Sequence, residues 1–347
     1  MLIVKNEMTM ETVIIPEGTK CIEKEEFKGR NDIVSVVIPE SVNMIGERAF
    51  SGCKALKSIT IPNSVTEIGK EAFFGCSALK SITIPDSVTE IGTRAFGYCE
   101  NLRYVTLSRN LKNIECGTFA NCEELREVVI PDSVERIETE AFAKCEELKS
   151  VLIPASVNLI EQGAFQECRM LSYLAVDPDN KRYDSREDCN AIIETNTGIL
   201  IAGCKHSFIP NSVKIIGENA FSGTMIEFIN IPDSVKDIEE CAFFGCSWLS
   251  EVIISASVTR IRSEAFAKCE SLENVVIPDS VVEIGNGAFE DIICLTAITL
   301  PESLVYMDGN AVSCCPNLES IYVPKGSEER FKAMLRYDEY CNLIKGV

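Results

Sequence analysis

Histidine is almost absent from this chain: His206 is the only one among 347 residues. No C-x-x-C pair occurs either, although the chain has 17 cysteines. Protein zinc sites use histidine and cysteine at short, paired spacings, so the sequence predicts no metal site. So many thiols without a metal-binding framework favour a reducing setting, either the cytoplasm or an anaerobic habitat.

Basic residues are few compared with acidic ones. There are 33 lysines and arginines against 53 aspartates and glutamates, which gives a net charge of −20. This charge repels phosphate backbones and anionic lipids, so we expect no nucleic acid partner. No apolar run reaches the roughly 18 residues that cross a bilayer, so we expect no membrane insertion. The opening residues also lack the basic start and apolar stretch of a signal peptide.

What the chain has instead is a strict repeat. Phenylalanine recurs every 23 residues through the first half, which indicates a solenoid whose units bury their apolar faces only by stacking. Later units are less regular, and Val312 replaces phenylalanine in the twelfth. The chain is therefore expected to form a single solenoid over residues 1–347. The repeated phenylalanines are Phe27, Phe50, Phe73, Phe96, Phe119, Phe142, Phe165, Phe221, Phe243, Phe266 and Phe289.

Within each unit two apolar patterns follow one another. Leu79, Ile82 and Ile84 end in the alternation of a strand, whereas the apolar residues within 65–73 have the spacings of a helical or 3-10 turn. We therefore expect an α/β repeat with one short strand and one such turn in each coil. Stacked strands would form a parallel β-sheet on a concave face, with the turns on a convex face.

The repeated letters I-P-x-S-V-x-x-I-x-x-x-A-F-x-x-C resemble the BspA-like branch of the leucine-rich repeat family, over nearly the whole chain. The resemblance implies a leucine-rich-repeat solenoid. It also implies adhesion to host or matrix proteins, at the cell surface or after secretion. Because the chain shows no signal peptide and many free cysteines, the sequence leaves its location open.

Three segments depart from the regular coil. Residues 177–209 lack the Ala-Phe pair, and their two apolar runs around Thr195-Asn196-Thr197-Gly198 predict a β-hairpin within an irregular extended repeat. We expect the extra residues to project from one side of the solenoid. Residues 1–30 are interpreted as an N-terminal cap repeat. Residues 324–347 are interpreted as a C-terminal cap, with a helix over 328–343 covering the last apolar layer.

Nine of the 17 cysteines lie three residues after the phenylalanine position, in nine of the twelve coils. Repetition argues for a structural role, and we expect buried thiols that reach backbone carbonyls. Disulfides are disfavoured because neighbouring Cβ vectors would run parallel. The cysteines in this column are Cys53, Cys76, Cys99, Cys122, Cys145, Cys168, Cys246, Cys269 and Cys315.

Catalysis would need residues that do not repeat, and only the irregular repeat holds such a group. Its spacings match no known nucleophile, phosphate or zinc motif, so a hydrolase site there is a remote alternative. Asp177-Pro178-Asp179-Asn180 is similar to a calcium loop but lacks the glycine and the distal glutamate. We predict no catalytic, cofactor-binding or metal-binding residues. The candidates in the irregular repeat are Asp184, Glu187, Asp188, Cys189, Cys204, Lys205 and His206.

Side chains at outward strand positions are not needed for packing of the core, so their identity can indicate a function. The middle coils place apolar and aromatic residues there, which favours a non-enzymatic scaffold that binds a protein, or a glycan, as a monomer. For the valines, strand preference is an equal explanation. The structural alternative is self-association through the hairpin. The predicted partner-binding residues are Tyr104, Val129, Leu152, Tyr173, Phe228, Ile253 and Val276.

A neighbouring outward column changes sign along the chain, and this change would orient a charged partner. It contains Lys57, Lys80, Arg103, Arg126 and Lys149, then Glu227, Glu273 and Glu319.

Overall fold

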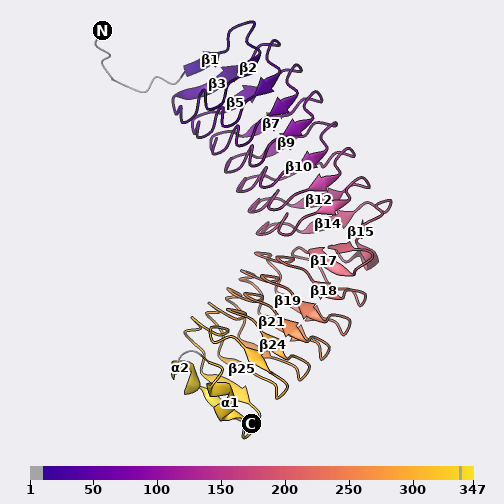
Figure 1. Cartoon of the computed structure of the whole chain (residues 1–347), viewed down its shortest axis with the longest axis vertical. Helices are drawn as coiled ribbons and strands as arrows, with labels where there is room; N and C mark the ends of the chain where they lie inside the picture. The colour runs from indigo at the N-terminus through magenta and orange to yellow at the C-terminus, as the bar shows by residue number, and fades with distance from the viewer. Residues whose placement is uncertain (1–10, 336–337) are drawn as a thin grey trace, which may run out of the picture. The chain divides into compact units, whose positions relative to one another are not determined.

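The computed structural model describes residues 11–335 and 338–347. The chain forms two compact units, Met1–Phe165 and Gln166–Val347, which we call unit 1 and unit 2. Each unit is a pile of stacked coils joined by parallel strands (Figure 1). The fold is therefore a parallel-strand β-solenoid, as the repeat predicted, but it has very little helix, whereas a helical or 3-10 turn was expected in each coil.

Most regular coils contribute strands to two ladders, not one. The long-strand ladder of unit 1 uses β1 (Glu11–Ile14), β3 (Ile33–Val37), β5 (Ser58–Thr60), β7 (Ser81–Thr83), β9 (Tyr104–Thr106) and β12 (Ser150–Ile153). Its short-strand ladder uses β2 (Cys21–Ile22), β4 (Met44–Ile45), β6 (Glu67–Ile68), β8 (Glu90–Ile91), β10 (Asn113–Ile114), β11 (Arg136–Ile137) and β13 (Leu159–Ile160). The second ladder was not expected from the sequence.

Unit 2 repeats this plan. Its long strands are β14 (Tyr173–Val176), β19 (Phe228–Ile231), β21 (Glu251–Ile254), β23 (Asn274–Val276), β25 (Ala297–Thr299), β27 (Ser320–Val323) and β28 (Ile344–Gly346). Its regular short strands are β18 (Ile215–Ile216), β20 (Asp237–Ile238), β22 (Arg260–Ile261), β24 (Glu283–Ile284) and β26 (Tyr306–Met307). Consecutive short strands pair in parallel, each shifted by one coil.

The segment around each phenylalanine differs from the expected helical or 3-10 turn. Arg48 and Gly52, on either side of Phe50, both have a left-handed backbone, with φ of 56° and 74°, and this conformation ends a helix. Ala49 donates to Gly46 within its own coil, whereas the Phe50 N–H donates to Ala72 of the next coil at 2.8 Å. The segment is thus a turn that shares its hydrogen bonds with its neighbours.

The core of each unit is a column of stacked rings beside a column of thiols. The rings of Phe50 and Phe73 lie 5.4 Å apart and 7° from parallel. The Cys76 Sγ donates to the carbonyl of Phe50 at 3.2 Å, which confirms the expected contact of buried thiols with backbone carbonyls. Desolvation raises the pKa of Cys99 to about 12, so this thiol stays protonated at neutral pH.

The irregular repeat adds three strands, which pair antiparallel with one another, to the short-strand ladder of unit 2. These are β15 (Tyr183–Asp184), β16 (Ile192–Glu194) and β17 (Ile199–Ala202), with the 3-10 turn η1 (Arg186–Asp188) between the first two. β17 then pairs in parallel with β18. Tyr183, Ile193 and Leu200 are buried, so much of the added chain packs into the core and does not project from it.

The turn that contains Glu167 bonds directly to the turn that contains Ser222, although the irregular repeat lies between them in the sequence. The N–H of Glu167 donates to the carbonyl of Ser222 at 2.8 Å, in the position that Gly52 and Phe74 occupy in unit 1. The carbonyl of Ala220 accepts from Gly203 at 2.7 Å. The added residues therefore enter the coil on its short-strand side.

The C-terminal segment closes the core of unit 2. The expected single helix over 328–343 is replaced by two short helices, α1 (Glu328–Lys332) and α2 (Asp338–Cys341), and β28 pairs with β27. Phe331 and Tyr340 are buried against the last coils. This segment shields the last apolar layer without a continuous helix.

Candidate functional site

In each unit, the outward side chains of the long strands and of the equivalent positions in coils without a long strand form a surface that we call the long-strand face of that unit. All seven residues predicted to bind a partner are exposed there, from 47% for Ile253 to 80% for Val129. Their inward neighbours, such as Val105 and Ile229, are buried. Alternation along the strand therefore places these residues as expected, and binding by them stays a prediction.

In unit 1 the apolar residues of this face have basic neighbours. Tyr104 forms an isolated parallel bridge with Glu127. Arg103 and Arg126 both approach the carboxylate of Glu124, at 3.3 Å and 3.9 Å. A pocket of about 440 Å³ lies between the coil of Thr106 and the coil of Val129. The patch in unit 1 is thus an apolar centre beside two arginines that share one carboxylate.

In unit 2 the corresponding neighbours are acidic. Phe228 lies opposite Glu251 in the pairing of β19 with β21. A pocket of about 670 Å³ is lined by Ile253 and Val276, with Glu251 and Glu273 beside them. The change of sign that the sequence showed is therefore carried by two separate patches, one in each unit.

Both pockets lie where the long-strand ladder is interrupted. β9 has only a single bridge to the following coil, and β21 and β23 belong to different sheets. In the coils of β9 and β21 a serine, Ser108 or Ser255, occupies the position where most coils have proline. These serines are the sequence signal that could have located the pockets. A third interruption, between β5 and β7, follows a coil with Pro62.

The candidate catalytic residues of the irregular repeat do not form a nucleophile and base. His206 is exposed, whereas Cys204 is buried and its thiol contacts Asn190 and Ser207. Desolvation raises the pKa of Cys204, and it raises the pKa of Cys189 to about 11. Both thiols are therefore protonated at neutral pH, which makes them poor nucleophiles.

Two acidic residues of this repeat, Asp184 and Asp177, serve local structure. Burial raises the pKa of Asp184, but hydrogen bonds from Arg186 and Thr195 outweigh burial and the pKa is lowered overall. The Asp177 carboxylate accepts from the N–H of Asp179 at 2.8 Å, which is a turn contact. Within residues 11–335 and 338–347, no three histidine, cysteine or acidic side chains are placed to hold a metal ion.

One polar residue that the sequence analysis did not single out holds the long-strand face in place. The Asn190 side chain accepts from the N–H of Leu174 and donates to the carbonyl of Ser172, both at 2.8 Å. These two groups flank Tyr173 on β14. The amide of Asn190 thus takes the place of a neighbouring strand, and Tyr173 is left facing outward.

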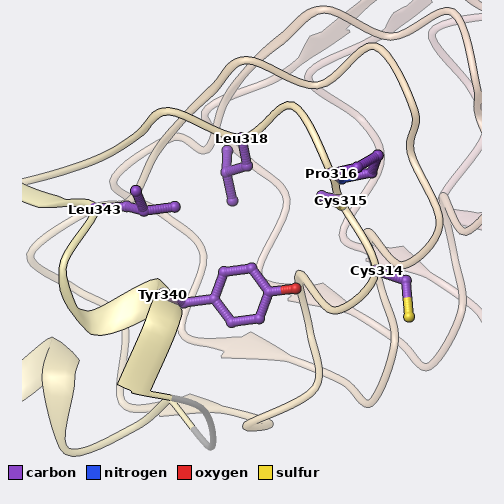
Figure 2. Close-up of a pocket in the computed structure, with 6 residues that line it drawn as sticks. All are labelled: Cys314, Cys315, Pro316, Leu318, Tyr340 and Leu343. Atoms are coloured by element: carbon purple, nitrogen blue, oxygen red, sulfur yellow. The ribbon is translucent and has the colours of Figure 1, made fainter.

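A further pocket, of about 560 Å³, lies at the C-terminal end of unit 2. Figure 2 shows Tyr340 projecting from α2 toward the coil that carries Cys315 and Leu318. The neighbouring Cys314 is exposed, and desolvation together with Asp291 raises its pKa. The pocket therefore has no activated thiol, and it belongs to the C-terminal cap.

Comparison with family models decides the family. The model of the BspA type leucine rich repeat region (6 copies) matches residues 4–122, 67–186 and 214–339. The chain belongs to the BspA-type leucine-rich repeat family. Comparison with curated proteins found no match. None of the helices in the described part of this BspA-type chain is long and apolar enough to cross a membrane.

Solved structures of the same fold cover most of this BspA-type chain. A leucine rich cell surface protein from Faecalibacterium prausnitzii A2-165 is 30% identical over 87% of this chain and 90% of its own, with a TM-score of 0.71. A leucine-rich repeat protein from Bacteroides ovatus ATCC 8483 is 26% identical over 99% and 94%, with a TM-score of 0.57. The pneumococcal vaccine antigen PcpA, 20% identical over 91% and 78%, shares the fold with a TM-score of 0.69.

Proposed function

We propose that this chain is a non-enzymatic scaffold that binds another protein through its long-strand face. The observation that carries the proposal is the row of exposed apolar and aromatic side chains on that face, which the packing of the coils does not require. Patches of this kind usually mark docking sites. Leucine-rich repeat families are typically non-enzymatic, and they suggest a scaffold for protein interaction.

Tyr104, Tyr173 and Phe228 are the strongest anchors in this proposal. Aromatic side chains supply large apolar area with few rotatable bonds, and they dominate many interfaces. Burying one such side chain contributes about 1.5 to 3 kcal/mol. The valines and isoleucines beside them would then exclude water around each anchor.

We further propose that the partner is a host or matrix protein met at the cell surface. The support is the relative from F. prausnitzii, which is described as a cell surface protein. The column of buried thiols is compatible with this location. Desolvation raises the pKa of the buried Cys76 well above its ordinary value, and a protonated, inaccessible thiol resists oxidation.

The test is a triple variant, Tyr104→Ser, Tyr173→Ser and Phe228→Ser, immobilised and exposed to purified extracellular-matrix proteins. Capture that the wild-type chain achieves should fall by about tenfold or more if these anchors bind. The matched control changes Phe208, Trp248 and Tyr306 to serine, because these residues are also exposed but lie off the long-strand face. Equal capture by both triple variants would rule out this face.

Self-association through the irregular repeat is the rival function. The apolar residues of its hairpin strands, including Ile193 and Leu200, are buried in the core of unit 2, so that segment offers little apolar area to a second copy. Light scattering over a concentration series separates the two functions, and we expect the mass of a monomer throughout.

A further inference from the structure

The long-strand ladder of unit 2 opens between β21 and β23. We propose that this opening is a docking groove for an extended protein segment that carries an apolar side chain next to lysine or arginine. The inference rests on the proposed function, since it names the chemistry of a partner for one part of the long-strand face. It follows from three independent features of the groove: its missing hydrogen bonds, its apolar floor and its acidic edge.

The first feature is a gap in the backbone hydrogen bonds. β19 pairs with β21 at four positions, and β23 pairs with β25 at three. Just before the strands, Ser250 donates to Glu227 at 3.0 Å and Thr296 donates to Glu273 at 2.8 Å. In the described part of the chain, no equivalent bond joins the N–H of Glu273 to the coil of Ser250. Along this line the two coils lie side by side without the backbone hydrogen bonds that join the neighbouring pairs of coils.

The second feature is the floor of the groove. Val252 occupies the inward position of β21, and its counterparts on either side, Ile229 and Val275, are buried to within 2%. Val252 itself is only partly buried and packs against the edge of the core. Together with Ile253 and Val276 it gives the groove of about 670 Å³ an apolar base. This volume falls in the range of about 300–1,000 Å³ that is typical of binding pockets.

The third feature is charge. Glu251 and Glu273 line the groove on its two sides, and no lysine or arginine lines it. Glu227 stands in the neighbouring coil, and all three carboxylates are exposed. In the residues described, none of the three makes an ion pair. Uncompensated carboxylates around an apolar base favour a partner whose apolar side chain has cationic neighbours.

The shape of the groove selects an extended segment. Its two walls are parallel strands, so a ligand lying along it follows the strand direction, in which alternate side chains of an extended chain point the same way. The N–H of Glu273 can donate to a carbonyl of such a segment, as in other cases where a peptide lies beside a strand. An apolar side chain would enter the floor at Val252, and its cationic neighbours would meet Glu251 and Glu273.

The test uses a fluorescein-labelled ten-residue peptide with Lys-Leu-Lys at its centre, titrated with the full chain and followed by fluorescence polarisation. Two further peptides carry Glu-Leu-Glu or Lys-Ser-Lys at the same place. We expect saturable binding of the first peptide that weakens as salt is raised. We expect binding at least about tenfold weaker for each of the other two.

Two charge-reversal variants place the binding site. Glu251→Lys with Glu273→Lys should weaken binding of the Lys-Leu-Lys peptide by about tenfold or more. Glu67→Lys with Glu90→Lys, on the short strands of unit 1, changes the net charge equally and should leave binding within about twofold. All four glutamates are exposed, so both variants should fold, and equal melting temperatures would confirm this.

Absence of peptide binding to the wild-type chain, or equal binding by the two charge variants, would overturn the groove. Either result would leave the proposed function standing, because Tyr104, Tyr173 and Phe228 do not line this groove and are tested by their own capture experiment. Equal binding of the Lys-Ser-Lys peptide would also overturn it, since it would show a purely electrostatic association.

Discussion

Gly203 lies directly against the ring of Phe221, so closely that an added Cβ would stand 2.1 Å from its Cε1 atom. Gly203 also donates its N–H to the carbonyl of Ala220. In a regular coil the repeated phenylalanine makes this bond, as Phe50 does to Ala72. In the irregular repeat, the backbone of Gly203 therefore occupies the space beside Phe221 that a phenylalanine ring fills in a regular coil. This replacement explains why the Ala-Phe pair is missing there.

The first prediction concerns this contact. Gly203→Ala should destabilise the chain by about 1 to 3 kcal/mol, because the new methyl group cannot fit without moving Phe221. Urea unfolding followed by circular dichroism measures the change. The matched control is Gly97→Ala, where the closest atom, Cδ2 of Phe74, is 3.2 Å from the added Cβ. A loss at Gly203 no larger than at Gly97 would contradict the prediction.

The second prediction separates folding from function. Phe73 is fully buried between Phe50 and Phe96, with ring centroids 5.4 Å and 5.2 Å away, so Phe73→Ala should lower the free energy of unfolding by about 3 to 5 kcal/mol. Val129→Ala should lower it by no more than about 0.5 kcal/mol, since Val129 is 80% exposed. Chemical denaturation of both variants checks this. A large decrease in the free energy of unfolding of Val129→Ala would show that Val129 stabilises the fold.

The third prediction concerns alkaline pH. Desolvation raises the pKa of Cys99 from 9.0 to about 12 in the folded chain, so above pH 9 the unfolded state binds fewer protons than the folded state. The contribution of this thiol to the free energy of unfolding should therefore be fully present below pH 9. It should be lost between pH 9 and 12, by up to about 1.4 kcal/mol per pH unit for one such thiol. Melting temperatures measured against pH test this, and Cys99→Ala should show a shallower decline than the wild-type chain.

The fourth prediction concerns Asn190. Asn190→Asp keeps the acceptor for the Leu174 N–H but places a carboxylate oxygen against the carbonyl of Ser172. The lost donor and the new repulsion should cost about 1 to 3 kcal/mol. Amide exchange at Leu174 should become faster, while exchange at Val105 in unit 1 should not change. Unchanged protection of Leu174 would show that β14 does not depend on this side chain.

The repeat made most of the architecture predictable. Buried positions such as Phe73 and Cys76 recur at one period, and strict repetition marks a residue that serves the coil. The exposed positions of Tyr104 and Val129 followed from alternation along a strand. These inferences depended only on spacing, which the amino-acid sequence displays directly.

Other features had no periodic signal. A two-residue strand such as Glu67–Ile68 is too short to show alternation. The turns imitate a helix because their apolar spacings of three and four are those of a helix face. The left-handed residues that prevent a helix include Arg48 and Glu71, which have no intrinsic preference for that conformation. The groove beside Val252 depends on how two coils meet, and only Ser255 hints at it.

The sharing of hydrogen bonds between neighbouring turns has a mechanical consequence. The N–H of Phe50 donates to the carbonyl of Ala72 in the next coil, and the thiol of Cys76 donates to the carbonyl of Phe50. Each coil is therefore held by hydrogen bonds to the coils directly before and after it. A pulling force applied to one end of such a unit should peel off layers in succession, with a low and repeating force for each. The unit would yield gradually under load and would restack when the tension is released.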